Sequence, residues 1–377
     1  MNEKDVFVVA DNVLTPLGKT TAENFSKLKQ NISAVKLHHN TNISSQSFYA
    51  SLFHKDESFI KNGKGYTKFE QLLIASIGNA LQNSGVDAKD KKTVFLISST
   101  KGNIGLLETE INNAELQKRI ALSTSAKLVS AYFGFVNQPI VISNACISGV
   151  LGIMTGMRLL RSGQYENAVI AGADVISEFI LSGFQSFQAL SAQVCKPFDK
   201  SRNGLNLGEG AGTIILSTQK KHPQNIKVMG GSVSNDANHI SGPSRTGKEL
   251  GYAITKALQD AALTPGDIDF VSAHGTATIY NDEMEANAIG LSHLQSVPLN
   301  SLKGYYGHTL GAAGLIESII SVQSLKEELL ISTKGFEETG VTSSVNVING
   351  NLPLKARNFL KTASGFGGCN AAVVFGK

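Results

Sequence analysis

The sequence has few of the features that mark secreted, zinc-binding or disulfide-rich proteins. It contains no Trp, eight Pro and only three Cys among 377 residues. Cys146, Cys195 and Cys369 are too few for a disulfide framework, and their spacings match no zinc site. We therefore expect a reducing, cytoplasmic location and no bound metal.

Long apolar runs and a strong charge of one sign are also missing. No window of about 18 apolar residues occurs, so we expect no membrane insertion. The N-terminal "VFVVA" has only five apolar residues before Asp11, which is short for a signal peptide and predicts a first strand. The formal charge is +4, the pI is near 8.8 and aromatic residues make up 7%. This balance does not predict nucleic-acid binding, but it suits an acidic protein partner.

Short apolar runs alternate with helical patterns along the chain. This alternation predicts the α/β class, with helices packed on mostly parallel sheets. Two halves share the plan without a residue-level repeat, and the polar "STQKKHPQN" favours a boundary between 1–218 and 219–377. Strands are predicted at 6–10, 93–99, 139–143, 167–173, 212–217, 226–233, 269–274, 297–301, 359–365 and 371–376, and helices at 68–83, 146–162, 246–262 and 311–327.

The predicted helix at 146–162 is rich in glycine. Gly149, Gly152 and Gly156 recur at spacings of three and four residues, and each costs about 1 kcal/mol relative to Ala in a helix interior. An apolar stripe that begins at Val150 covers another side of the same helix. The pattern predicts a helix in the middle of the protein, closely packed on both sides.

Cys146 stands where an apolar strand gives way to this helix. A helix start favours the reactive thiolate, although a free cysteine is also among the most buried residue types. His274 in "VSAHGTAT" and His308 in "KGYYGHTLGAAG" also follow predicted strands and precede predicted helices. Because ligand sites form at the carboxyl ends of parallel strands, the three side chains predict one pocket.

Five motifs follow one another in the order found in β-ketoacyl-[acyl carrier protein] synthases. They are "NACISG" (144–149), "KPFDKSRNGLNLGEGAG" (196–212), "AHGTAT" (273–278), "KGYYGHTLGAAG" (303–314) and "GFGGCN" (365–370). The chain resembles this family from about Thr93 to its end, and more weakly before. The resemblance implies the thiolase fold, with two similar βαβαβαββ halves in a layered αβαβα arrangement.

The resemblance also implies an acyltransferase that performs a decarboxylative Claisen condensation. Cys146 would hold an acyl group, and malonyl-[acyl carrier protein] would supply the attacking carbon. His274 and His308 would donate hydrogen bonds to the malonyl thioester oxygen. The backbone amides of Cys146 and Phe366 would form the oxyanion hole. Lys303 and Glu285 would form a charge pair that supports the histidines.

Further positions are assigned by the same resemblance. Phe366 would gate the acyl pocket, with Phe184 and Ile147 beside it. Cys195 and Cys369 would be small fillers. No cofactor is implied, because phosphopantetheine belongs to the carrier. The residues expected along that arm are His239, Ser241, Thr276 and Thr278.

The implied partners are an acyl carrier protein and a second subunit, either a copy of this chain or a related ketosynthase. Basic side chains expected to meet the acidic carrier are Lys61, Lys64, Lys68, Lys200 and Arg202. Ile147, where a small residue is usual, and "IYND" after "HGTAT" depart from the family pattern. These departures suggest a specialised synthase of fatty acid, polyene or polyketide-type biosynthesis.

Two other interpretations stay open. The chain could be a non-catalytic subunit, similar to a chain length factor, that shapes the pocket of an active partner. The presence of Cys146, His274, His308 and Lys303 opposes this interpretation. A thiolase-like enzyme acting on coenzyme A esters is opposed by Cys369, which lies outside the late cysteine motif of thiolases.

Overall fold

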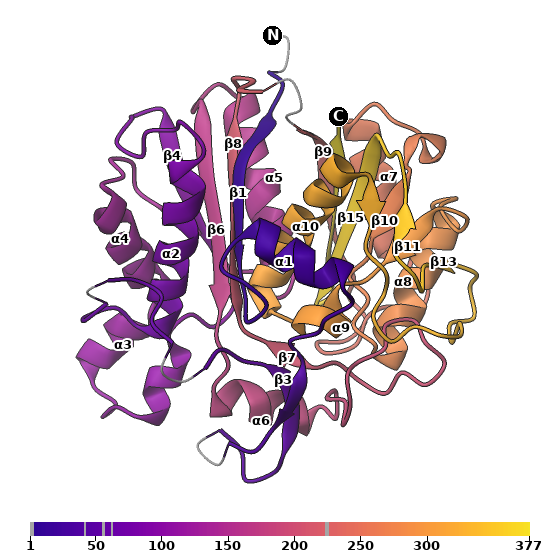
Figure 1. Cartoon of the computed structure of the whole chain (residues 1–377), viewed down its shortest axis with the longest axis horizontal. Helices are drawn as coiled ribbons and strands as arrows, with labels where there is room; N and C mark the ends of the chain where they lie inside the picture. Colours follow the sequence, from indigo (N-terminus) through magenta and orange to yellow (C-terminus); the bar gives the residue numbers. More distant parts are fainter. Residues whose placement is uncertain (1–3, 41–42, 55–56, 62, 223–225) are drawn as a thin grey trace.

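The structure, a computed structural model, describes residues 4–40, 43–54, 57–61, 63–222 and 226–377 (Figure 1). The N-terminal half contains β1 (Phe7–Leu14), α2 (Lys68–Gln82), β4 (Thr93–Ser98), α4 (Leu122–Phe133), β5 (Ile140–Ile142), α5 (Ser148–Arg161), β6 (Asn167–Asp174) and β8 (Gly210–Ser217). The C-terminal half contains β9 (Lys227–Asn235), α7 (Lys248–Asp260), β10 (Phe270–Ser272), α8 (Ile279–Leu291), β11 (Pro298–Asn300), α10 (Ala313–Glu327), β15 (Asn358–Gly365) and β16 (Cys369–Gly376).

Shorter elements connect these units. They are α1 (Thr21–Lys29), β2 (Lys36–His38), β3 (Phe48–Ser51), η1 (Ile104–Glu108), α3 (Ala114–Ile120), α6 (Glu178–Ser186), β7 (Leu207–Gly208), η2 (Pro265–Asp267), α9 (Lys303–Tyr306), η3 (Leu310–Ala312), β12 (Leu329–Leu330), β13 (Asn346–Val347) and β14 (Leu352–Pro353). Each strand predicted from the sequence is present, with ends shifted by a few residues.

The two halves pair their strands in the same way. In each half the first strand lies antiparallel to the last, β1 to β8 and β9 to β16. The last strand then lies antiparallel to the one before it, β8 to β6 and β16 to β15. Parallel pairs complete each half, as β6–β4–β5 and β15–β10–β11. The predicted pair of βαβαβαββ halves is therefore confirmed.

The halves meet where β1 touches β9, at Phe7 and Lys227. Eleven of the described strands thereby form one sheet, ordered β13-β11-β10-β15-β16-β9-β1-β8-β6-β4-β5, and the other described strands form two small sheets, β2-β3-β7 and β12-β14. α5 and α10 lie between the two parts of this sheet, α2 and α4 cover one outer side, and α7 and α8 cover the other (Figure 1). This is the predicted layered arrangement. A domain boundary after residue 218 stays a prediction.

The glycines of α5 explain how this central layer packs. A Cβ on Gly149 would lie 2.6 Å from the backbone nitrogen of Leu315 in α10, and one on Gly152 would lie 3.0 Å from Ile170 in β6. The apolar stripe of α5 that begins at Val150 is buried. The prediction of a central helix packed on both sides is confirmed. Helix α5 begins at Ser148, so the loop before it carries Cys146.

Candidate active site

One cavity of about 490 Å³ brings together the three predicted reactive side chains, Cys146, His274 and His308. Each of them lies in the connection that follows a parallel strand, namely β5, β10 and β11, and the short helix α9 comes between β11 and His308. The carboxyl ends of these strands therefore form the floor of the site, as expected for an α/β protein. Residues of both halves of the chain line it.

The loop that carries Cys146 is held by a residue that the sequence did not single out. Ala145 has a left-handed backbone, with φ of 43°. The Ser148 hydroxyl donates to the Ala145 carbonyl at 2.7 Å and accepts from the Asn144 amide at 2.8 Å. These bonds close the turn and place Cys146 immediately before α5. Only its spacing of two from Cys146 could have identified Ser148.

Burial controls the chemistry of the thiol. It raises the pKa of Cys146 to about 12, while the positive charge of Lys303 acts in the opposite direction. A helix start favours the thiolate, as the sequence predicts, but burial has the larger effect on the pKa of Cys146 and acts in the opposite direction. Cys146 is nevertheless only half-buried, whereas Cys195 and Cys369 are buried. Burial raises the pKa of those two thiols as well, to about 12 and about 11.

The two histidine rings lie side by side. Their centroids are 5.2 Å apart and their planes meet at 79°. Burial, followed by the charge of Lys303, holds the pKa of both His274 and His308 well below the usual value, so both rings are neutral. Neither Nδ1 has a hydrogen-bond partner among the described residues. Since an unpaired buried N–H is costly, we expect each proton on Nε2, where it can be donated.

Two carboxylates of α8 shape the turn that carries His274. Glu285 accepts hydrogen bonds from the amides of His274 and Gly275 at 2.8 and 2.7 Å. Asp282 accepts from the amides of Thr276 and Ala277 at 2.9 and 3.1 Å. Each carboxylate thus holds two successive N–H groups. Asp282 was missed in the sequence, although it lies three residues before Glu285 and so on the same helix face.

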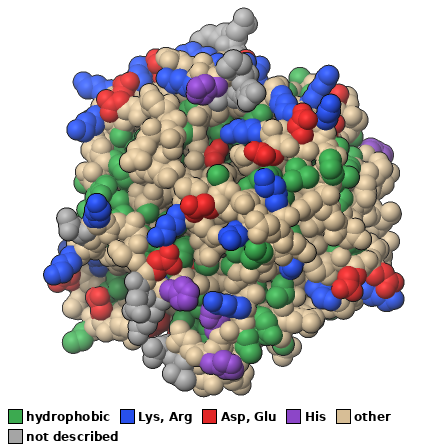
Figure 2. All heavy atoms as spheres, in the orientation of Figure 1, with side chains coloured by type: hydrophobic (Ala, Val, Ile, Leu, Met, Phe, Trp, Pro, Cys, Tyr) green, Lys and Arg blue, Asp and Glu red, His purple; other side chains and the backbone are tan. Residues whose placement is uncertain are grey.

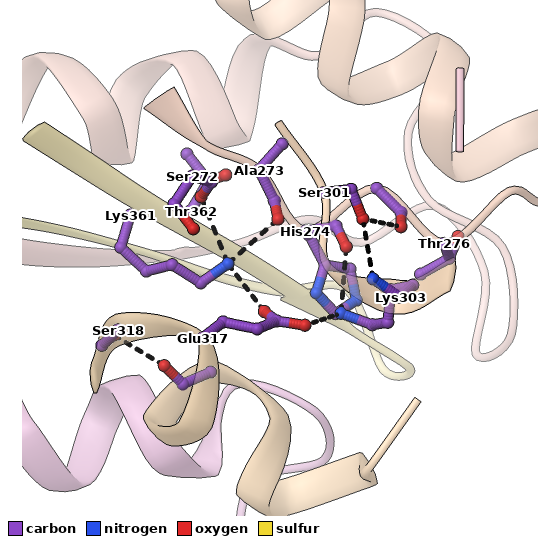
Figure 3. Close-up of polar contacts among 12 residues, drawn as sticks. Ser272, Ala273, His274, Thr276, Ser301, Lys303, Glu317, Ser318, Lys361 and Thr362 are labelled. Carbon is purple, nitrogen blue, oxygen red and sulfur yellow. Dashed lines mark hydrogen bonds and ion pairs between the residues drawn. The ribbon is translucent and has the colours of Figure 1, made fainter. Parts of the chain in front are cut away.

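Lys303 does not pair with Glu285, and that prediction is wrong. The ammonium of Lys303 pairs with Glu317 of α10 and donates to the His274 carbonyl at 3.0 Å (Figure 3). Glu285 is already occupied by backbone amides and by Thr362, which donates at 2.6 Å. Glu317 was missed as well. Its signal is a single charged residue in the otherwise uncharged and mostly apolar "GLIESIISV".

Phe366 and two further phenylalanines form one wall of the cavity. The Phe366 ring stacks on Phe184 at 5.8 Å and meets the edge of Phe187 at 5.3 Å. Phe187 was not predicted. A Cβ on Gly365 would lie 2.9 Å from the Cys146 nitrogen, so the absence of a side chain there lets the Phe366 segment approach the Cys146 loop.

Ile147 lies outside this wall. Its side chain is 1% exposed and packs in the central core with Val150 and Leu315. The cavity lining does not include it. The prediction that Ile147 shapes the acyl pocket is therefore wrong, because the turn before α5 directs its side chain into the core.

The four polar residues predicted along the carrier arm all line the cavity: His239, Ser241, Thr276 and Thr278. They form two pairs. The Thr276 and Thr278 hydroxyls are 2.9 Å apart, and the Ser241 hydroxyl lies 3.2 Å from Nδ1 of His239. Hydroxyl and imidazole groups here can hydrogen-bond an amide-rich chain that enters the cavity.

The predicted basic side chains differ in their surroundings. Lys61 and Lys64 are exposed, and Lys200 is exposed beside Glu338 at 3.0 Å. Lys68 pairs with Glu209 at 2.6 Å. Arg202 has a side chain only 6% exposed, which pairs with a carboxylate at 3.7 Å and donates to two carbonyls. Arg202 is therefore not a surface cation.

Acidic and basic side chains are interspersed on the face shown in Figure 2, without one large basic field. Among the described residues, no helix is both long and apolar enough to cross a bilayer. Nor does the described part of the chain hold a cluster of His, Cys, Asp and Glu suited to a metal ion.

Comparison with known proteins agrees with this geometry. The family model "Beta-ketoacyl synthase, N-terminal domain" matches residues 3–222, and "Beta-ketoacyl synthase, C-terminal domain" matches residues 226–337. A 3-oxoacyl-[acyl-carrier-protein] synthase 2 of Mycobacterium bovis is 32% identical over 249 residues, which cover 62% of this chain and 60% of the relative. The enzyme of the same name from Vibrio cholerae is 28% identical over 100% of this chain and 99% of its own.

Solved structures share the fold. A β-ketoacyl synthase from Burkholderia phymatum has a TM-score of 0.90 at 23% identity, and 99% of each chain is covered. A ketosynthase from Xenorhabdus doucetiae, in complex with its chain length factor, has a TM-score of 0.87 at 23% identity, with 99% and 98% covered. The two family models together match most of the chain, which therefore belongs to the β-ketoacyl synthase family.

Proposed function

We propose that the chain is a β-ketoacyl-[acyl carrier protein] synthase that joins an acyl group on Cys146 to a two-carbon unit from malonyl-[acyl carrier protein]. The observation that carries the proposal is the shared cavity, in which a thiol faces two neutral imidazoles. A thiol serves as an acyl carrier, and neutral imidazoles serve as hydrogen-bond donors. A non-catalytic subunit would not need this combination.

The first half-reaction transfers the acyl group. The sulfur of Cys146 attacks the thioester carbonyl, the bond to the carrier arm breaks, and the Cys146 proton ends on the departing arm thiol. The amides of Cys146 and Phe366 are proposed to hold the oxygen that becomes negative. Their proximity rests on the close approach of Gly365 to the Cys146 nitrogen.

The second half-reaction makes the new carbon–carbon bond. The malonyl carboxylate leaves as carbon dioxide, and the electron pair moves toward the thioester oxygen, to which His274 and His308 donate from Nε2. The resulting carbon attacks the acyl carbonyl, the bond to Cys146 breaks, and the sulfur takes up a proton from water. Neutral rings suit this step, because they stabilise the enolate while keeping their own protons.

No cofactor takes part in these steps, since the carrier brings its own phosphopantetheine arm along Thr276, Thr278, His239 and Ser241. We propose a dimer, either of this chain or with a related subunit, because one structural neighbour is a ketosynthase with its chain length factor. The pathway and the cytoplasmic location stay predictions from the sequence.

The proposal is tested by separating the two half-reactions. The purified protein is incubated with acyl carriers of several chain lengths and examined by mass spectrometry for an acyl adduct on Cys146. Carbon dioxide release is then measured with malonyl carrier, and C146A serves as the control. An adduct on Cys146 together with condensation product supports the proposal. Absence of both with every carrier would show that the chain is a non-catalytic subunit.

A further inference from the structure

A second buried lysine lies behind the histidines, and the proposed reaction does not use it directly. Lys361 of β15 is 0% exposed and does not line the cavity. Its ammonium lies 2.7 Å from Glu317 and donates to the carbonyls of Ser272 and Ala273 at 3.2 and 3.0 Å (Figure 3). The two residues that precede it in the strand, Phe359 and Leu360, are buried and apolar.

The bonds of Lys361 end on the peptide that leads into His274. Lys361 holds the carbonyls of Ser272 and Ala273, and Lys303 holds that of His274. Three successive carbonyls therefore meet two ammonium groups. The amides that follow meet the carboxylates of α8. Hydrogen bonds to charged groups are the stronger kind, so this turn is held more firmly than an ordinary loop.

Positive and negative side chains are distributed unevenly around the rings of His274 and His308. Glu317 of α10 lies between Lys303 of α9 and Lys361, so this group carries two cations for one anion (Figure 3). On the other side, Glu285 and Asp282 of α8 direct their oxygens at backbone amides. Burying two ammonium groups against one shared carboxylate is costly, which indicates that the second lysine has a use at this position.

We propose that Lys361 is a positioning residue for condensation, which fixes the peptide leading into His274 and supplies a second positive charge behind both histidines. The inference rests on the proposed function. The positive charge of Lys361 lowers the pKa of His274 and His308, although its effect is smaller than those of burial and Lys303 and, for His274, smaller than that of His308. Neutral rings can then persist at the lower end of the physiological pH range, where an ordinary histidine is protonated.

The test uses K361M and K361Q, which both remove the charge, while Gln keeps a donor for the two carbonyls. Malonyl decarboxylation is followed from pH 5 to pH 9. With either variant the acidic limb of the pH–rate profile should move up by about one pH unit, because a nearby cation no longer opposes ring protonation. The rate above that limb should fall about 10- to 100-fold with K361M, through loss of alignment, and less with K361Q.

Two controls make the result specific. L360A removes a buried side chain from the same strand without changing charge, and its acidic limb should match the wild type. Acyl transfer to Cys146 should continue in K361M and K361Q, which also reports folding. If K361M does not fold, the pH–rate profile of K361Q provides the same test. An unmoved limb in a folded variant, or an equal loss of acyl transfer, overturns the inference. Failure of the wild type in both half-reactions overturns the proposed function instead.

Discussion

The carboxylate of Asp174, at the end of β6, accepts a hydrogen bond from the backbone amide of Gly311 at 2.7 Å. It also accepts from the Ser99 hydroxyl at 2.7 Å and, more weakly, from the Thr100 amide. Gly311 lies in η3, between His308 and α10. One buried carboxylate thus joins the N-terminal half to the loop of the C-terminal half that carries His308, a proposed hydrogen-bond donor.

This link should make stability depend on pH in a particular direction. Burial raises the pKa of Asp174 to about 6. Because the folded pKa exceeds the unfolded one, the contribution of Asp174 to stability is complete below about pH 4 and is lost as pH rises through about 6. The free energy of unfolding of the wild type, measured relative to that of D174N, should therefore fall by about 2–3 kcal/mol from pH 4 to pH 7. Urea denaturation at both pH values measures it, and a constant difference would contradict the assignment.

Iodoacetamide should label Cys146 ahead of Cys195 and Cys369, because only Cys146 is half-buried and lines the cavity. Burial raises the pKa of Cys146 to about 12, so the labelling rate should still be rising at pH 9. Peptide mass spectrometry over pH 6 to 9 tests both points. Equal labelling of the three cysteines would show that the cavity does not set access to the thiol.

H308A should separate the half-reactions. His308 is proposed to stabilise the malonyl enolate, so its loss should leave acyl transfer to Cys146 largely intact. Condensation should fall by about 10²–10³-fold, as for one lost donor to a developing negative oxygen. Single-turnover acylation and steady-state condensation are measured on the same preparation. A larger loss in acylation than in condensation would reverse the assigned roles.

Phe187 should affect which acyl groups the cavity accepts. Its ring edge contacts Phe366, and F187A should free Phe366 to move, raising kcat/KM for long acyl carriers relative to short ones by up to about tenfold. Phe179 offers a matched control, because it is 55% exposed against 53% for Phe187 and does not line the cavity. Unchanged selectivity in F187A, or the same change in F179A, would contradict a role for this contact.

The exposed lysines should affect carrier docking rather than chemistry. Charge reversal at Lys61, Lys64 and Lys200 should raise the KM for acyl carrier and flatten its salt dependence, since rim charges act mainly on association. Turnover of a small acyl-pantetheine should hardly change. Reversal of the exposed Lys89, Lys91 and Lys92 is the control, because they precede β4 at the end of the sheet opposite the cavity. An equal effect of both triple variants would place docking elsewhere.

Much of this architecture could be predicted, because short apolar runs such as those of β4 and β8, which are buried along their whole length, alternate with helical patterns in the sequence. The glycines of α5 indicated close packing before Leu315 and Ile170 were known as the neighbours. The predictions that are wrong concern which side chains pair and how deeply they are buried, and the order of residues along the chain does not specify either. The ion-pair partner of Lys303 depends on which nearby carboxylate is not already engaged, and Glu285 already accepts hydrogen bonds from two backbone amides.

The depth at which a side chain is buried and the direction in which it points could not be predicted from the sequence either. A helix start favours a thiolate at Cys146, yet the depth of burial decides the pKa of the thiol. Ile147 is adjacent to the proposed nucleophile, but its side chain packs in the central core, after a turn that contains the left-handed Ala145. Lys361 lies in an apolar strand and resembles no functional motif by itself. Its hydrogen bonds to the Ser272 and Ala273 carbonyls are what point to its proposed role.

The two halves of the chain repeat one strand order, and each half contributes a loop to the proposed reaction. Cys146 lies between β5 and α5, and His308 lies between β11 and α10, so both occupy the connection from the third strand to the central helix of their own half. A pseudo-twofold relation therefore sets the loop proposed to hold the acyl group against the loop proposed to donate a hydrogen bond to the enolate, across one chamber. Each loop belongs to a different half of the chain, but the hydrogen bond between Asp174 and Gly311 couples them, so we expect a substitution that adjusts one stage to affect the other as well.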